Sequence, residues 1–195
     1  MTVRSPRRLE KIRAVIDRKQ PTLGVVMENI HDPHNVSAVL RSCDAVGIVR
    51  VELLYTLEKF PRIGKKSSSS ANKWLAIRRH TVVEECIQTL REEGFRIYAT
   101  RIAPRTLSLY DLDLTQKVAL IFGNEHRGVS DEASALADET FQIPMMGMIQ
   151  SLNVSVAAAV ALYEALRQRA RSGYYDLQQL SPPEREHMFE DWKER

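Results

Sequence analysis

Polar side chains gather in three short segments of the sequence, and each segment follows an apolar run that predicts a buried strand. Residues 29–41 combine histidine, aspartate, asparagine and arginine. Residues 123–130 place a glutamate between two glycines, and residues 143–155 set a serine and an asparagine behind an apolar run with three methionines. Ligands of open α/β sheets bind beyond the carboxyl ends of the strands. The segments therefore predict one composite site for a small organic ligand, an apolar slot with a few directed polar groups.

The sequence lacks the motifs of several common classes of enzyme and cofactor site. It has neither GxGxxG after the first strand nor GxxxxGK[ST], which disfavours an ordinary Rossmann cofactor site and a P-loop nucleotidase. His31, His34 and Asp32 suggest a metal, but no Cys/His pair elsewhere completes a zinc set, so we expect no metal. Ser151 is not flanked as GxSxG, which disfavours a serine hydrolase.

The same polar residues also have structural roles open to them. Asn35 could cap the helix that follows it, and Arg41 could pair with an acid. Either Ser151 or Asn153 could cap a long helix. Residue type and spacing alone leave the structural and the functional interpretation open.

Apolar periodicity predicts the elements that position these segments. Buried or half-buried strands are expected at residues 23–28, 49–55, 74–78, 96–102, 118–122 and 141–144. Helices are expected from Pro6 to a stop before Pro21 and at residues 35–46, 82–93, 130–137 and 152–171, with a last one after Pro182 and Pro183. Strands that alternate with helices predict a mostly parallel α/β sheet with both faces covered.

Positive charge is concentrated in two islands of the chain. Residues 1–20 hold seven Lys or Arg against two acids, a net +5, and residues 59–79 hold seven and no acid, a net +7. The net charge of the whole chain is +3, so the remainder carries −9. Such islands are either solvated faces or the footprint of a polyanion such as a nucleic acid.

Composition limits the class of protein. The 195 residues are 44% hydrophobic and 27% charged, which is ordinary for one globular domain and disfavours a disordered tail, a fibre or a disulfide scaffold. No run of about 18 apolar residues predicts a membrane helix, and the basic start is not followed by the apolar segment of a secretory signal. With two distant cysteines, we expect a cytoplasmic protein.

Three strings carry a family resemblance: PHNVSAVLRSCDAVG, IFGNEHRGVS and IPMMGMIQSLNVSVAAAVALYEALRQR, at residues 33–47, 121–130 and 143–169. In this order they resemble the three motifs of the SPOUT superfamily of RNA methyltransferases, and most closely its TrmH family of tRNA guanosine 2′-O-methyltransferases. The resemblance implies a mostly parallel α/β sheet with a deep trefoil knot in roughly residues 96–173. It also implies a homodimer whose active site is completed across the interface.

The resemblance divides the chain into a basic helical arm (residues 1–20), a SPOUT domain (21–173) and a C-terminal tail with a helix (174–195). It implies S-adenosylmethionine as the cofactor, held in a bent form. The residues implied to hold it are Thr100, Gly123, Ile143 and Leu152.

The catalytic residues implied by the resemblance are Arg41, Asn35, Ser151, Asn153 and Glu125. A guanidinium stays protonated up to about pH 12. We therefore expect Arg41 to fix an RNA phosphate and stabilise developing alkoxide charge, with Asn35 orienting it. Ser151 and Asn153 would shape the same pocket.

The resemblance implies methyl transfer to the ribose 2′-OH of guanosine 18 in the tRNA D-loop, with tRNA and a second copy of the chain as partners. The RNA-binding candidates are Arg8, Lys11, Lys19, Arg41, Arg167 and Arg169. The alternatives are a 2′-O-methyltransferase for ribosomal RNA or another tRNA position, and a catalytically silent RNA-binding homologue. We assign no role to the serine run 67–70.

Overall fold

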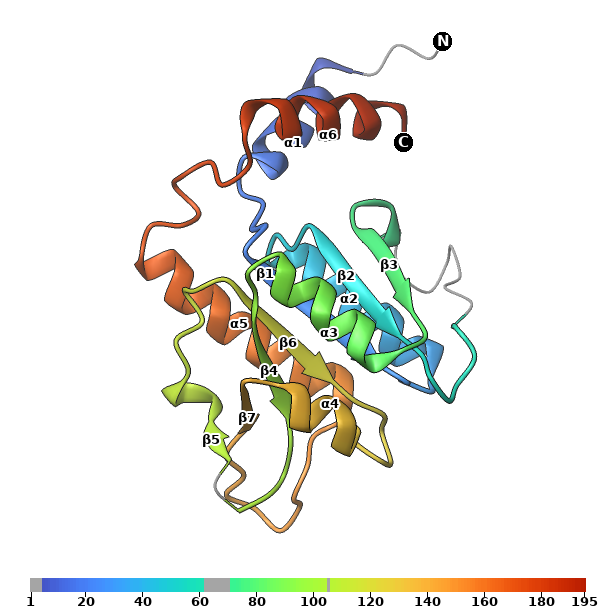
Figure 1. Ribbon diagram of the computed structural model, residues 1–195. Helices are drawn as coiled ribbons and strands as arrows, with labels where there is room; N and C mark the ends of the chain where they lie inside the picture. The colour runs from blue at the N-terminus through green and yellow to red at the C-terminus, as the bar shows by residue number, and fades with distance from the viewer. Residues whose placement is uncertain (1–4, 62–70, 105) are drawn as a thin grey trace.

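Seven parallel strands form one sheet in the computed structural model, which describes residues 5–61, 71–104 and 106–195 (Figure 1). The strands are β1 (Leu23–Glu28), β2 (Arg50–Leu54), β3 (Ala76–His80), β4 (Arg96–Thr100), β5 (Leu107–Ser108), β6 (Val118–Phe122) and β7 (Glu139–Gln142). Their order across the sheet is β3-β2-β1-β6-β4-β7-β5, and every pair is parallel. This confirms the predicted α/β sheet.

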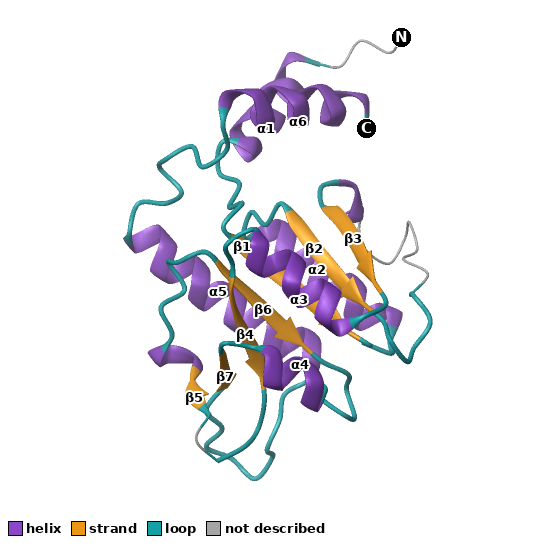
Figure 2. Ribbon diagram, in the orientation of Figure 1, coloured by secondary structure: helices purple, strands orange, loops and turns teal. Residues whose placement is uncertain are grey.

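Helices cover both faces of this sheet (Figure 2). They are α1 (Pro6–Ile16), α2 (Pro33–Ala45), α3 (Val83–Glu92), α4 (Asp131–Leu136), α5 (Val154–Arg171) and α6 (Pro182–Glu194), with 3-10 turns η1 (Ala71–Lys73) and η2 (Leu109–Asp111). Helices α2 and α5 pack together on one face, and α3 and α4 lie on the other. None of the described helices has both the length and the apolar character needed to cross a membrane.

Strand β1 contributes buried side chains to both faces of the sheet. All six of its residues are buried. Val25 and Met27 point into the core beneath α2 and α5, whereas Val26 points into the core beneath α3 and α4. Because side chains alternate along a strand, a continuous apolar run fills both layers at once.

Several element boundaries differ from the sequence predictions. Helix α2 begins at Pro33 rather than Asn35, because the Asp32 carboxylate caps it by accepting the His34 N–H at 2.8 Å. The Asn35 side chain is therefore free for other partners, and its expected capping role is wrong. Strand β5 was not predicted, since two residues are too few for a periodic signal.

The two ends of the chain pack against each other. Ile12 and Ile16 of α1 are buried with Phe189 and Trp192 of α6, and the Trp192 ring meets Trp74 edge-on at 5.0 Å between centroids. Figure 1 shows α1 and α6 side by side beyond one end of the sheet. The basic arm is thus one half of a helical pair and not an independent appendage.

Lys19 lies inside this junction, and its prediction as an RNA-binding residue is wrong. Its side chain is fully buried. The ammonium lies 3.3 Å from the Asp44 carboxylate, donates to the Ile48 carbonyl at 3.1 Å and stands 5.0 Å from the centre of the Trp192 ring. Burial lowers the pKa of Lys19, although Asp44 opposes this shift. The residue ties the helical pair to α2.

Arg169 was also predicted to bind RNA, and this prediction is wrong for the same reason. Its guanidinium is fully buried at the C-terminal end of α5. It donates five hydrogen bonds of 2.6–3.2 Å, to the carbonyls of Leu114, Thr22 and Gln116 and to the side chains of Gln20 and Thr22. These bonds join α5 to the amino-terminal edge of the sheet.

We expect Arg169→Leu to lower the free energy of unfolding by about 3 kcal/mol or more, because it leaves several buried oxygen atoms without donors. Urea unfolding at one protein concentration measures this. Arg171→Leu, a change at an exposed arginine of the same helix, serves as the control and should stay within about 0.5 kcal/mol. An Arg169 variant as stable as the wild type would contradict the structural assignment.

Candidate active site

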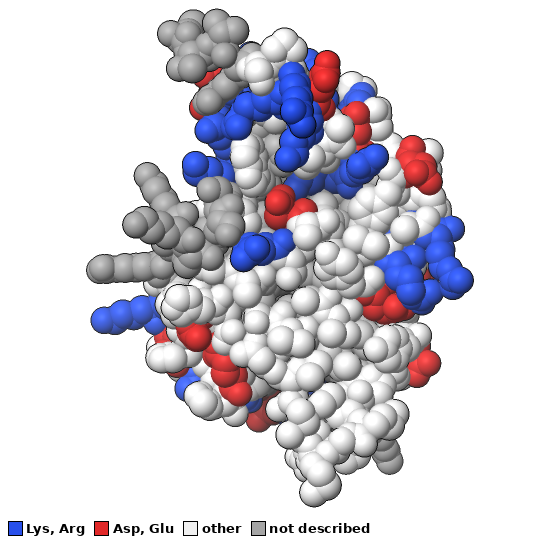
Figure 3. All heavy atoms as spheres, turned by 180° about the vertical axis from the view of Figure 1, so that it is seen from behind, with Lys and Arg blue, Asp and Glu red and all other residues white. Residues whose placement is uncertain are grey.

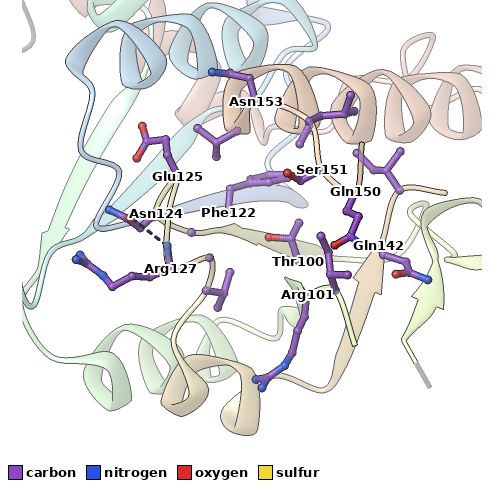
Figure 4. Close-up of a pocket in the computed structure, with 18 of the residues that line it drawn as sticks. Thr100, Arg101, Phe122, Asn124, Glu125, Arg127, Gln142, Gln150, Ser151 and Asn153 are labelled. Carbon is purple, nitrogen blue, oxygen red and sulfur yellow. Dashed lines mark hydrogen bonds between the residues drawn. The ribbon is translucent and has the colours of Figure 1, made fainter. Parts of the chain in front are cut away.

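A pocket of about 840 Å³ opens at the carboxyl ends of β4, β6 and β7 (Figure 4). Its walls come from the loops that follow β4 and β6 and from the segment that joins β7 to α5. The four residues predicted to hold a cofactor all line it: Thr100, Gly123, Ile143 and Leu152. Glu125, Ser151 and Asn153 line it as well. The second and third polar segments of the sequence therefore meet at one site.

The loop after β6 is closed on itself and requires glycine at position 123. A Cβ atom on Gly123 would lie 2.1 Å from the carbonyl carbon of Gly128, closer than real Cβ contacts permit. Asn124 and Gly128 exchange two backbone hydrogen bonds of 2.8 and 3.0 Å, and Gly128 adopts a φ of +70°. This loop brings backbone rather than side-chain atoms to the pocket.

Two asparagines of the first and second polar segments, neither of them a predicted site residue, hold this loop in place. Asn29 follows β1 with a φ of +49°, and its side-chain oxygen accepts three backbone N–H groups from residues 56–58. The Asn124 amide donates to the Asn29 carbonyl at 2.7 Å and accepts the N–H groups of His126 and Arg127. Sequence analysis missed both residues, and an asparagine directly after a buried strand is a weak signal for such a turn.

The carboxylate of Glu125 connects the first polar segment to the second. It accepts the backbone N–H groups of His31 and Asp32 at 2.9 and 3.2 Å and the side-chain amide of Asn35 at 2.8 Å. Partial burial raises the pKa of Glu125, but these hydrogen bonds outweigh it and hold the pKa below its ordinary value. The side chain is an anion at the N-terminal end of α2, where the helix dipole also favours negative charge.

Asn35 continues the connection to the third segment. Its side-chain oxygen accepts the Asn153 amide at 3.2 Å, and Asn153 in turn caps α5 by accepting the Ser155 N–H at 2.8 Å. Within one chain both ends of the Asn35 amide therefore have partners other than Arg41, and the role of Asn35 in orienting Arg41 stays a prediction. The chain Glu125–Asn35–Asn153 links all three loops.

Arg41 lies apart from this chain of hydrogen bonds. Six residues separate it from Asn35, which is about 9 Å along a helix axis. Its side chain is exposed on α2, and no described residue pairs with it. Arg41 is also not among the described residues that line the pocket. The expected acid partner is therefore not seen, and the guanidinium is available to an external anion.

The methionines of the third segment do not fill an apolar slot as we expected. Met145 lines the pocket, but Met146 and Met148 are 94% and 99% exposed, and the neighbouring Ile149 is exposed too. These side chains point away from the body of the subunit. An apolar surface of this kind indicates a further contact that covers it.

No metal site is visible in the described parts of the chain, since no three His, Cys, Asp or Glu side chains gather there at ligand distance. His31 lies 3.5 Å from the Glu58 carboxylate at the surface, and His34 is exposed. The first polar segment instead serves to bind the Glu125 carboxylate.

The fold and the pocket define a class: parallel α/β proteins in which the loops after the strands line a pocket of the size that small organic ligands fill. Residues 22–163 match the family model described as the SpoU rRNA Methylase family. The chain belongs to this family, which confirms the resemblance found in the sequence.

Relatives of known structure or name agree with this assignment. The chain is 44% identical to the tRNA (guanosine(18)-2′-O)-methyltransferase of Thermus thermophilus, over 98% of both chains. The crystal structure of the Aquifex aeolicus TrmH/SpoU tRNA modifying enzyme superposes with a TM-score of 0.90 at 35% identity, over 95% of this chain and 94% of that one. The SpoU methyltransferase AviRb of Streptomyces viridochromogenes, solved in complex with AdoMet, gives a TM-score of 0.69 at 30% identity, over 80% and 64%.

We expect Glu125→Gln to lower the free energy of unfolding by about 1–2 kcal/mol at pH 7, because the charged form accepts three hydrogen bonds. A carboxylate whose folded-state pKa is lowered stabilises the protein above its ordinary pKa of 4.5, and this stabilisation is lost as the pH falls through the folded-state value. The difference between wild type and variant should therefore shrink below about pH 4.5.

Urea unfolding at several pH values between 7 and 3 measures this difference. Glu85→Gln, at an exposed position on α3, is the matched control and should differ little from the wild type at any pH. A Glu125→Gln difference that stays constant across the whole range would show that the carboxylate charge is not what the loops depend on.

Proposed function

We propose that this chain transfers a methyl group from S-adenosylmethionine to the ribose 2′-OH of guanosine 18 in the tRNA D-loop. The observation that carries the proposal is the Glu125–Asn35–Asn153 chain, which joins all three predicted motifs around one pocket. The name of the Thermus thermophilus relative, which this chain matches along nearly its full length, supports the same substrate.

The residues of the pocket fit the proposed cofactor. A volume of about 840 Å³ is within the usual range for organic ligands. Ile143, Leu152 and the rings of Phe122 and Phe141 supply apolar walls, and the tight turn at Gly123 presents backbone groups. The Thr100 hydroxyl already donates to the Ile121 carbonyl at 3.0 Å, so Thr100 would contribute its backbone and methyl group. When bound, the cofactor supplies an activated methyl group on a sulfonium.

Arg41 is the proposed catalytic residue, and its proposed role is to bind the RNA. Its guanidinium is exposed, and a guanidinium carries a positive charge in proteins. It fixes an RNA phosphate and stabilises the developing alkoxide, while the proton leaves to a phosphate oxygen or to water. Glu125 is a poor proton acceptor because hydrogen bonds already stabilise its anion. We place it, with Asn35, Ser151 and Asn153, in shaping the site.

The distance of Arg41 from the pocket of its own chain supports a homodimer in which one subunit supplies Arg41 to its partner's pocket. Val156 and Tyr163 of α5 are about half exposed, and Met146 and Met148 extend the same apolar character beyond the helix. Figure 3, which views the molecule from behind, shows a broad area without charged side chains in its lower half. A two-fold contact would cover this area.

Charged residues near the helical pair provide the proposed tRNA surface. Lys11 is exposed and Arg8 partly exposed on α1, and Arg167 is about half exposed although it pairs with Glu164. Figure 3 shows Lys and Arg side chains gathered at the top of the molecule, toward the end where α1 and α6 lie in Figure 1. The basic residues Arg4, Arg62, Lys65 and Lys66 and the serine run 67–70 lie outside the described residues.

The proposal also includes a trefoil knot in roughly residues 96–173 and a cytoplasmic location. The strand order supports the knot, because β6 lies between β1 and β4 while β7 lies on the far side of β4. The connection from β6 to β7 therefore has to pass β4. A cytoplasmic location follows from the tRNA substrate.

We expect Arg41→Ala to lower the single-turnover rate of tRNA methylation by about 10²–10³-fold, because it removes a charged donor at the reacting oxygen. The Kd for S-adenosylmethionine should stay within about twofold, since Arg41 does not line the pocket. Arg91→Ala, on the opposite face of the sheet, is the control and should leave both values unchanged. A rate within a few-fold of the wild type would refute the catalytic role.

A mixing experiment tests the shared site. Arg41→Ala keeps its pocket, and Gly123→Val keeps Arg41 but displaces the loop that lines the pocket. Mixed dimers of two inactive chains should contain one complete site and regain activity. If mixtures in which subunit exchange has been verified stay inactive, Arg41 and the pocket that it serves must belong to the same chain. That result would contradict the shared site.

A further inference from the structure

Glu28 is a buried carboxylate that has no role in the mechanism above. It is the last residue of β1 and is 1% exposed. One oxygen, Oε2, accepts the Ser130 N–H at 2.9 Å. The other, Oε1, is buried and has no hydrogen-bond partner among the described residues. An acceptor buried in this way lowers stability, so its presence needs an explanation other than stability.

The position of Glu28 supplies that explanation. It and the adjacent Asn29 hold the two ends of the loop that follows β6. Asn29 accepts the Asn124 amide at the start of the loop, and Glu28 accepts the Ser130 N–H at its end. Ser130 is also the residue that caps α4, through the Ala133 N–H at 3.1 Å.

The loop between these two anchors has little freedom of its own. Gly123 and Gly128 are in backbone contact, and residues 122–129 all line the pocket. If the Ser130 N–H loses its acceptor, the end of the loop can shift away from β1 and carry Gly128 and Val129 with it. Cofactor binding then has to return the loop to its position, and this cost weakens the binding free energy.

We propose that Glu28 is a positioning residue for the cofactor: its carboxylate fixes the end of the loop that forms the pocket, and it is retained for binding at a cost in stability. The proposal rests on the assignment of this pocket to S-adenosylmethionine. It distinguishes Glu28 from a residue that only stabilises the fold, whose loss lowers the melting temperature.

The test compares three variants by calorimetric titration with S-adenosylmethionine and by thermal unfolding. Glu28→Leu removes the acceptor and fills a similar volume. Glu28→Gln keeps an oxygen that can accept the Ser130 N–H. Glu52→Gln is the matched control, since Glu52 is equally buried in β2, pairs with Arg50 and His80, and lies away from the pocket.

We expect Glu28→Leu to raise the Kd about tenfold or more, with a melting temperature equal to or above that of the wild type. Glu28→Gln should bind within about twofold of the wild type. Glu52→Gln should lower the melting temperature and leave the Kd unchanged. At saturating cofactor, Glu28→Leu should methylate tRNA within a few-fold of the wild-type rate, so that the defect appears in KM and not in kcat.

The proposal is overturned if Glu28→Leu binds within twofold of the wild type, or if it melts as far below the wild type as Glu52→Gln or fails to fold. A wild-type protein that does not bind S-adenosylmethionine would refute the assignment of the pocket, and the role of Glu28 with it.

Discussion

The anionic carboxylate of Glu125 is the interaction on which the candidate site depends. It sits at the N-terminal end of α2, where two backbone N–H groups and the Asn35 amide converge on it. Asn35 then orders Asn153, and Asn153 caps α5. A single charge thus fixes three loops that are far apart in the sequence. Because groups of the chain itself make these hydrogen bonds, the pocket needs little reorganisation to bind a ligand.

Helix α5 is fixed at both ends, and this determines which surfaces remain for partners. Its N-terminal end is tied to the site through Asn153, and its C-terminal end is held by the buried Arg169 guanidinium. The exposed side of the helix carries Val156 and Tyr163 and is part of the surface at which we propose that a second subunit binds. The packed termini form a separate region in which Lys19 is internal and Lys11 is external. In the proposed function the dimer contact therefore adjoins the pocket, while the RNA contact at α1 lies at the packed termini.

Much of the architecture could be predicted from the sequence because it follows from periodicity. Leu23–Glu28 and Val118–Phe122 are continuous apolar runs, and both are central strands. The polar segments after the strands had to meet at one edge of a parallel sheet. Long-range partners could not be predicted in this way. Lys19 and Arg169 were assigned to RNA because the family resemblance implies that basic terminal helices bind it, yet both are buried by elements distant in sequence. The role of Asn35 could not be predicted without knowing that α2 begins at Pro33. The unpaired oxygen of Glu28 could not be predicted either, because it results from the packing around it.

The central claim is that this organised pocket serves methyl transfer to one ribose of tRNA. The most direct measurement is mass-spectrometric mapping of an unmodified tRNA transcript after incubation with the protein and S-adenosylmethionine carrying a labelled methyl group. We expect one labelled methyl group, on the ribose of guanosine 18, and none on a transcript with 2′-deoxyguanosine at that position. Label on a base, on another nucleotide, or on no nucleotide at all would contradict it.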